Sequence, residues 1–336
     1  MESVDLAGGE AAASSWRLAV APMLGWTDRH FRYLVRLLSR HVRLYSEMVV
    51  AAHLHRSDPE KLLAFSPEER PLALQLAGND PELLAAWARL GERFGYDEIN
   101  LNVGCPSSPV QKGRFGAYLM LEPDRVADCI AAMREAVSIP VTVKCRIGVD
   151  QSDGYDPLRR FVEKVADGGC RVFIVHARKA WLKGLSPKEN RSVPPLRYDL
   201  VYRLKRERPD LTVVLNGGVT TLGAAEEHLA AVDGVMIGRA AYHNPYLLAE
   251  ADRRLFGTRS PPLSREELLA RFLPYIRRQL SRGERFWSIG RHLLGLYHGQ
   301  PGAKRWRRLL TERGRDPEAG LRLLEAWLRS PKSAIV

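Results

Sequence analysis

One cysteine lies where barrel enzymes carry out their chemistry. The segment 100–106, Asn-Leu-Asn-Val-Gly-Cys-Pro, ends an alternating apolar run and places Cys105 on a loop punctuated by glycine and proline. In a closed α/β barrel the carboxyl ends of the strands carry the reacting groups. A loop thiol with polar neighbours can act as an acid or a nucleophile, whereas a thiol on an apolar face usually packs. Cys105 is therefore the first candidate for catalysis.

Two other apolar runs carry basic side chains near their ends. The run Val141–Ile147 alternates in polarity, so that Lys144 and Arg146 share one face. A lysine inside a strand needs a ligand or a charge partner, and the alternative to a binding role is a buried ion pair with a carboxylate. His176 ends the next run, just before Arg178, and is either a site residue or a core histidine.

Glycine turns follow the last two apolar runs. They are Asn216-Gly217-Gly218 and Gly238-Arg239. Barrel enzymes often bind a phosphate with the loops at these two positions and the start of a short helix. Such glycines also occur in ordinary turns, but the adjacent arginine adds a positive charge suited to an anion. We predict a phosphate site here.

The elements that must position these residues form a repeating pattern. Amphipathic helical segments lie between several of eight short apolar runs, which are Arg17–Ala21, Leu44–Val49, Leu72–Ala77, Glu98–Val103, Val141–Ile147, Arg171–Ala177, Thr212–Leu215 and Gly234–Ile237. Eight strands alternating with helices predict an α/β fold of the (β/α)8 TIM-barrel type. A doubly wound open sheet is the alternative, but no GxGxxG motif follows the first run.

The pattern changes after residue 257. Pro261-Pro262 lies in a linker, and Ser264 to Glu267 has the form of a capping box. Four helices and no strand are predicted after it, over Arg265–Ser281, Trp287–Leu296, Lys304–Thr311 and Pro317–Leu328. Residues 258–336 hold 17 Lys and Arg against 7 Asp and Glu, a net charge of +10 out of +12 for the chain. Such a concentration is typical of a polyphosphate-binding surface, and a solvated helical face is the alternative.

These features predict three segments in a chain of 336 residues. They are a flexible lead-in (1–15), a barrel domain (16–257) and a small, basic, all-helical C-terminal domain (258–336). No apolar run is long enough to span a membrane, and the N-terminus lacks the pattern of a signal peptide. The four cysteines form no CxxC pair, which argues against a metal site and is typical of reduced thiols in the cytoplasm.

Several of these segments together resemble the tRNA-dihydrouridine synthase family over residues 17–330. The matching motifs are Pro22-Met23 with Trp26-Thr27-Asp28, Ser46-Glu47-Met48, Gln75-Leu76, the segment 100–106, Lys144-Cys145-Arg146, His176-Ala177-Arg178, Asn216-Gly217-Gly218 and Ile237-Gly238-Arg239-Ala240. Segments 176–191 and 302–308 resemble the A-type bacterial subfamily, which modifies positions 20 and 20a in the D-loop of tRNA.

The resemblance implies a bound FMN, NADPH or NADH as reductant, tRNA as substrate, and no metal. We expect a cytoplasmic monomer. The FMN-binding residues it implies are Ala21, Pro22, Met23, Gln75, Lys144, His176, Asn216, Gly217, Gly218, Gly238 and Arg239. The tRNA-binding residues, from the barrel rim and the basic tail, are expected to be Asn102, Arg146, Arg178, Lys188, Arg191, Arg305 and Arg308.

The implied reaction reduces the C5=C6 bond of uracil. Reduced flavin delivers a hydride to C6, and the enolate character that results needs a proton at C5. Cys105 is suited to donate it, since most thiols are protonated at neutral pH.

Three alternatives remain: a flavin barrel acting on free pyrimidines, similar to dihydroorotate dehydrogenase; a Schiff-base aldolase using Lys144; and a non-catalytic RNA-binding module. The first gives no reason for the basic tail, the second would be colourless, and the third needs neither Cys105 nor phosphate loops.

Overall fold

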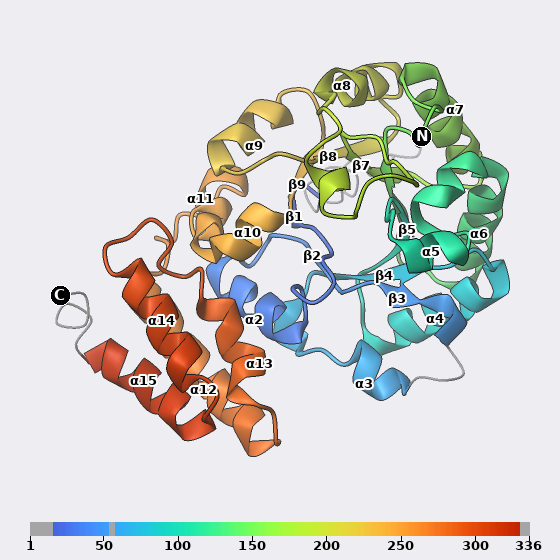
Figure 1. Cartoon of the computed structure of the whole chain (residues 1–336). Helices are drawn as coiled ribbons and strands as arrows, with labels where there is room; N and C mark the ends of the chain where they lie inside the picture. Colours follow the sequence, from blue (N-terminus) through green and yellow to red (C-terminus); the bar gives the residue numbers. More distant parts are fainter. Residues whose placement is uncertain (1–15, 54–57, 330–336) are drawn as a thin grey trace, which may run out of the picture.

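A barrel of parallel strands forms the larger part of the molecule (Figure 1). The computed structural model describes residues 16–53 and 58–329, so the predicted lead-in over 1–15 lies outside the described residues. The strands are β1 (Leu18–Val20), β2 (Leu44–Tyr45), β3 (Val49–Val50), β4 (Leu72–Ala77), β5 (Glu98–Val103), β6 (Val141–Arg146), β7 (Val172–His176), β8 (Thr212–Asn216) and β9 (Gly234–Ile237).

The strand order shows how the barrel closes. Neighbours pair in the order β1-β9-β8-β7-β6-β5-β4-β2, and β3 also pairs with β4. The run predicted as one strand over 44–49 is therefore two short strands in a single barrel position. A parallel bridge between Ala19 and Arg43 joins β1 to the segment before β2. The barrel prediction is confirmed, and the open sheet is wrong.

Alternation along each strand separates two apolar layers. Val143 and Cys145 of β6 point outward into the large core shared with the helices. A smaller cluster fills the barrel itself, made of Trp16, Ala19, Ala21, Tyr45, Ala73, Val172, Ile174, Val214 and Met236. The alternate β6 residues Thr142, Lys144 and Arg146 share the opposite face, as predicted. Buried polar side chains, Glu98, Asn100 and Thr142 among them, also lie in the barrel interior.

Helices cover the outside of the barrel. They are α2 (Arg29–Leu38), α3 (Pro59–Leu63), α4 (Pro81–Phe94), α5 (Ser108–Lys112), α6 (Pro123–Ala136), α7 (Tyr155–Asp167), α8 (Tyr198–Glu207), α9 (Leu222–Leu229), α10 (Arg239–His243) and α11 (Ala251–Leu255). Asp80 caps α4 by accepting from the backbone N–H groups of Glu82 and Leu83. Cys129 and Cys170 are buried and pack in the core between the barrel and its helices.

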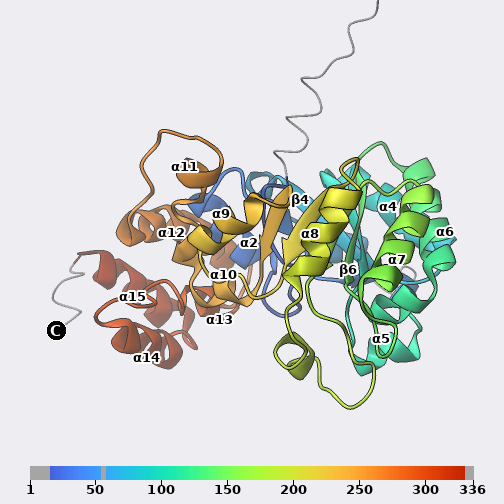
Figure 2. The same cartoon turned by 90° about the horizontal axis from the view of Figure 1, so that it is seen from above.

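Four α-helices of the described residues follow the barrel and pack beside it (Figures 1 and 2). They are α12 (Arg265–Ser281), α13 (Phe286–Gly290), α14 (Ala303–Arg313) and α15 (Pro317–Arg329), with α12 starting at the predicted Ser264 capping box. Asp28, which caps α2, accepts from Arg291 and His292 of this helical part. His30 of α2 lies 2.8 Å from the Tyr275 hydroxyl of α12. These contacts fix the C-terminal helices against the barrel.

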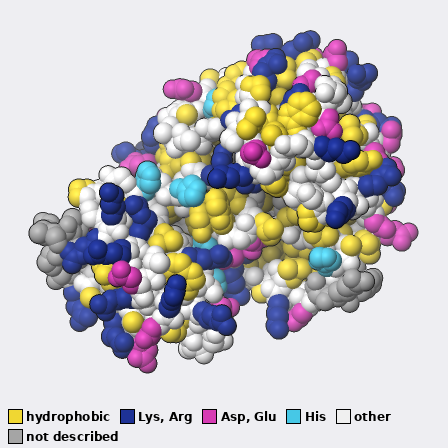
Figure 3. Space-filling model, in the orientation of Figure 1, with side chains coloured by type: hydrophobic (Ala, Val, Ile, Leu, Met, Phe, Trp, Pro, Cys, Tyr) yellow, Lys and Arg dark blue, Asp and Glu magenta, His cyan; other side chains and the backbone are white. Residues whose placement is uncertain are grey.

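The basic side chains are concentrated on the C-terminal helices. Figure 3 shows Lys and Arg gathered over this part of the molecule, on the face seen in Figure 1. Figure 2 shows α14 on the same side of the molecule as α5 and the loop before α8, which follow β5 and β7. Within the described residues, no helix is both long and apolar enough to cross a membrane.

Candidate active site

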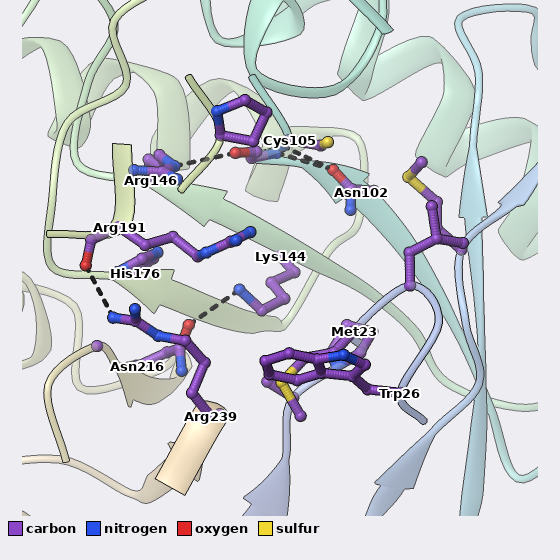
Figure 4. A pocket seen from close by; sticks show the side chains of 18 of the residues that line it. Met23, Trp26, Asn102, Cys105, Lys144, Arg146, His176, Arg191, Asn216 and Arg239 are labelled. Carbon is purple, nitrogen blue, oxygen red and sulfur yellow. Dashed lines mark hydrogen bonds between the residues drawn. The ribbon is translucent and has the colours of Figure 1, made fainter. Parts of the chain in front are cut away.

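A cavity of about 550 Å³ opens at the carboxyl ends of the strands (Figure 4). Its walls come from nearly every strand end of the barrel. Most of the predicted site residues line it, namely Ala21, Pro22, Met23, Gln75, Asn102, Cys105, Lys144, Arg146, His176, Arg191, Asn216, Gly217, Gly218, Gly238 and Arg239. Its volume lies within the range usual for sites of small molecules and cofactors.

The loop of Cys105 is held by its own backbone. The Cys105 N–H donates to Asn102 Oδ1 at 3.0 Å, and its carbonyl accepts from the Ala117 N–H at 2.9 Å. Gly116 has φ +62°, and a Cβ there would lie 2.6 Å from the Cys105 carbonyl oxygen, so this position requires glycine. The half-buried Sγ lies 3.4 Å from Ser107 Oγ. The thiol is thus held at the cavity wall and still open to a ligand.

Lys144 projects into the centre of the cavity in Figure 4. Its Nζ donates to Asn216 Oδ1 at 3.0 Å, and Asn216 Nδ2 donates to the Met236 carbonyl at 2.7 Å. Burial, and then the charge of Arg146, lowers the pKa of Lys144 to about 8. In the described part of the chain, no carboxylate pairs with Lys144. The buried ion pair considered from the sequence is therefore not what this lysine forms.

The cavity is cationic. Arg191 and Arg239 lie together, with an Arg239 guanidinium N–H donating to the Arg191 carbonyl at 3.1 Å. Burial, followed by the charges of Arg146 and Lys144, holds the pKa of His176 well below 6.5, so its ring is neutral at pH 7. No Asp or Glu occurs among the described residues that line the cavity. Such a set of charges suits an anionic ligand.

Arg146 joins two loops of the cavity wall. Its Nε donates to the Gly104 carbonyl at 2.9 Å, and one terminal nitrogen donates to the carbonyls of Lys179 and Asn190 at 3.0 and 2.8 Å. The side-chain amide of buried Asn190 in turn accepts from the Trp181 backbone N–H and donates to the Trp181 carbonyl. Arg146 therefore holds the cysteine loop against the loop that follows β7.

The two glycine turns border the same cavity. Gly217 and Gly218 have φ values of +111° and +75°, which side chains rarely adopt. A Cβ on Gly217 would lie 2.6 Å from His176 Cδ2, and one on Gly218 would lie 2.5 Å from the Tyr198 hydroxyl. Gly238 follows β9 and precedes Arg239. Only glycine fits at positions 217 and 218, against the side chains of His176 and Tyr198.

Four predicted site residues lie outside the cavity lining. They are Arg178, Lys188, Arg305 and Arg308. Arg178 donates to the Pro194 carbonyl, and its buried Nε has no hydrogen-bond partner among the described residues. Lys188 is exposed on the loop after β7, while the half-buried Arg305 and the exposed Arg308 lie on α14.

Three apolar residues of the rim were not predicted as site residues. Leu24 is 76% exposed, and Trp26 stacks on Tyr242 with ring centroids 4.4 Å apart. Met48 lines the cavity beside them. Trp26 and Met48 belong to motifs that the sequence analysis noted without assigning them a role. In the sequence these three residues cannot be distinguished from apolar core residues. Only the structure, which places them in the cavity lining, identifies them as site residues.

A barrel with a thiol and two glycine turns at the carboxyl ends of its strands has the layout typical of a barrel enzyme. Comparison with known proteins identifies which one: the dihydrouridine synthase (Dus) family model matches residues 19–331, and the chain belongs to this family. It is 55% identical to the tRNA-dihydrouridine(20/20a) synthase of Synechocystis sp., covering 94% of each chain. It is also 55% identical to the Vibrio cholerae enzyme of the same name, covering 94% of this chain and 96% of that one.

A solved structure of 2-naphthoyl-CoA reductase has a similar fold. It matches with a TM-score of 0.55 at 12% sequence identity, over 70% of this chain and 50% of that one. At this identity the likeness concerns the barrel fold alone.

Proposed function

We propose that this protein is an FMN-dependent oxidoreductase that reduces the C5=C6 bond of uridines 20 and 20a in the D-loop of tRNA. The observation that carries the proposal is that the Cys105 thiol and the glycine turns border one cavity in a chain of the dihydrouridine synthase family. We propose that it works as a cytoplasmic monomer, with NADPH as reductant.

The hydrogen-bond donors and cationic groups of the cavity suit FMN. The phosphate is assigned to Asn216, Gly217, Gly218, Gly238 and Arg239, where cationic and backbone donors meet and no carboxylate intervenes. The remaining flavin contacts are assigned to Ala21, Pro22, Met23, Gln75, Lys144 and His176. Neutral His176 can donate one hydrogen bond and accept another. When bound, reduced FMN supplies the hydride for C6, and NADPH restores it.

The protein's own part in the chemistry is proton transfer and charge stabilisation. Cys105 donates its proton to C5, and the thiolate that remains recovers a proton from solvent. Lys144, charged below pH 8, offsets negative charge that develops in the cavity. Carbon C6 gains a hydride and C5 gains a proton, so the double bond becomes a single bond and the base gains two hydrogens.

The titration of Lys144 predicts how cofactor binding depends on pH. Because this lysine loses its proton as the pH rises through about 8, we expect the affinity of the apo-protein for FMN to fall about tenfold between pH 7 and 9. Quenching of FMN fluorescence measures this affinity. Lys144→Met should bind FMN more weakly at pH 7 and lack this pH dependence. The same pH dependence in the variant would show that another group is responsible.

A uridine in the folded tRNA elbow must leave its stack to enter the cavity. The surface assigned to hold the tRNA comprises Asn102, Arg146 and Arg191 of the cavity wall, Arg178 and Lys188 of the segment after β7, and Arg305 and Arg308 on α14. Phosphates of the tRNA would lie along the barrel rim and the basic helices, which face the same side (Figure 2).

Charge reversal on α14 tests this surface. We expect Arg305→Glu/Arg308→Glu to weaken tRNA binding and to lower the slope of log Kd against log salt by about 1–2, because up to two phosphate contacts are lost. Filter binding over a range of salt concentrations measures both quantities. The matched control is Arg160→Glu/Arg206→Glu, the same charge change on exposed residues of α7 and α8. An unchanged slope in the α14 variant would exclude α14 from the tRNA surface.

Two measurements test the proposed activity. The purified protein should absorb near 450 nm, whereas a Schiff-base aldolase would be colourless. In tRNA from cells that lack the protein, mass spectrometry should show uridines 20 and 20a lighter by about 2 Da, since each has missed the addition of two hydrogens. Unchanged masses at both positions would contradict the proposal.

A further inference from the structure

We propose that Glu98, at the amino end of β5, fixes the orientation of the Cys105 loop through a chain of buried side chains that runs up the inside of the barrel. The chain links Glu98 to Thr142, Asn100, Gln75 and Asn102 in turn, and it ends on the backbone of the cysteine loop. The effect of this chain on catalysis rests on the proposed function of Cys105, whereas the hydrogen bonds of the chain are observed in the structure.

The Glu98 carboxylate, at the start of the chain, can only accept hydrogen bonds. Its carboxylate is fully buried and accepts from Trp16 Nε1 at 2.8 Å, Arg43 at 3.0 Å, the Tyr45 hydroxyl at 2.9 Å and the Thr142 hydroxyl at 2.5 Å. A carboxylate that faces four donors, one of them a guanidinium, has no proton to give. The hydroxyl proton of Thr142 must therefore point towards Glu98.

The direction of each later hydrogen bond follows from this first one. With its proton committed, Thr142 Oγ1 accepts from Asn100 Nδ2 at 2.8 Å. Asn100 Oδ1 then accepts from Gln75 Nε2 at 2.8 Å. Gln75 Oε1 accepts in turn from Asn102 Nδ2 at 2.9 Å. In each of these side-chain amides the NH2 group must donate to the acceptor on the side nearer Glu98. The amide oxygen therefore points towards the cysteine loop.

The final bonds lie in the candidate active site. Asn102 Oδ1 accepts from the backbone N–H groups of Gly104 and Cys105 at 3.1 and 3.0 Å (Figure 4). If the side-chain amide of Asn102 were rotated by 180°, its NH2 group would face the N–H groups of Gly104 and Cys105, and the loop would lose both hydrogen bonds. Glu98, Thr142 and Asn100 line no part of the cavity. They are positioning residues that act through Gln75 and Asn102.

The strand register explains why the chain is continuous. Gln75 pairs with Asn100, and Asn100 with Thr142, on the neighbouring strands β4, β5 and β6. Residues 98, 100 and 102 of β5 alternate onto the barrel interior. Thr142, Asn100 and Gln75 are at most 1% exposed, so water does not compete for these hydrogen bonds.

The test compares Thr142→Val with two controls. Valine keeps the shape of threonine but can neither donate to Glu98 nor accept from Asn100. Thr142→Ser keeps both bonds. Tyr45→Phe removes another hydrogen bond to the same Glu98 oxygen without touching the chain. Hydrogen exchange of the peptide that contains Gly104 and Cys105 reports the loop directly.

We expect amide exchange in this peptide to accelerate about fivefold in Thr142→Val, the effect of losing about one hydrogen bond, and to remain at the wild-type rate in both controls. Alkylation of the native protein should also change in rate, and it reports Cys105 because the other three cysteines are buried. On tRNA, kcat should fall at least about tenfold in this variant with a smaller change in KM, since the loop is misplaced while Arg305 and Arg308 of the basic helices are untouched.

Each outcome decides the proposal. Wild-type exchange in Thr142→Val, or equal acceleration in Thr142→Val and Tyr45→Phe, would overturn it, because the effect would then be absent or merely general destabilisation. Acceleration in Thr142→Val that neither Thr142→Ser nor Tyr45→Phe shows supports it. Exchange and alkylation need neither flavin nor tRNA. They would therefore still answer the question if the wild-type protein proved inactive on tRNA, which would contradict the proposed function alone.

Discussion

Replacing Cys105 by alanine is expected to lower turnover on tRNA by about a hundredfold or more, the usual contribution of a positioned general acid. The side chain is half-buried and its loop is held by backbone bonds to Asn102 and Ala117, so its removal leaves the wall of the cavity in place. Flavin content and tRNA affinity should therefore remain at their wild-type values. Single-turnover formation of dihydrouridine measures the effect.

Native alkylation provides the control for this variant. Of the four cysteines, only Cys105 is not buried, so the wild-type protein should take up one equivalent of iodoacetamide and Cys105→Ala none. The same modification should inactivate the wild-type enzyme. Dihydrouridine formation at the wild-type rate by Cys105→Ala would remove the cysteine from the mechanism.

Replacing Gly217 by alanine is expected to weaken FMN binding and to lower the flavin content of the purified protein. At φ +111° a side chain is strained, and the new Cβ would lie 2.6 Å from Cδ2 and 2.9 Å from Nε2 of His176. Either the turn or the ring must move, and both border the cavity. A strain of about 1–3 kcal/mol placed on the bound conformation corresponds to a loss in FMN affinity of about 5- to 150-fold.

Gly257→Ala is the matched control for this strain. Gly257 also has a positive φ, +68°, but a Cβ there meets nothing within 4 Å, and the residue does not line the cavity. We expect this variant to lose some thermal stability and to keep its flavin absorbance near 450 nm. If Gly217→Ala were to purify with a full complement of flavin, the turn would not be the phosphate site.

The barrel could be predicted because its signals are local. Alternation within a strand decides which side chains share a face, so the common face of Lys144 and Arg146 follows from residues 141–147 alone. The capping box at Ser264 likewise marks the start of α12 within four residues. The run 44–49 was less informative, because its polar centre, Ser46-Glu47, contains no glycine or proline that would show where the backbone leaves the sheet; the run forms two strands.

The site was predicted less completely. The strand-end residues that line the cavity were found because parallel strands bring their carboxyl ends together. The rim positions of Leu24 and Trp26 were not found, since an exposed apolar residue and a core residue look alike in the sequence. The assignments of individual residues to FMN and tRNA stay predictions.

By itself the sequence determined the kinds of groups this protein can use: a loop thiol, two glycine turns, cations at strand ends and a basic helical tail. The tertiary structure decided their partners. Lys144 binds an amide instead of a carboxylate, Arg146 joins two loops, and Glu98 lies at the end of a polar chain that reaches the cysteine. These contacts depend on the register between strands far apart in the chain, and the two-residue period of each strand carries no information about that register.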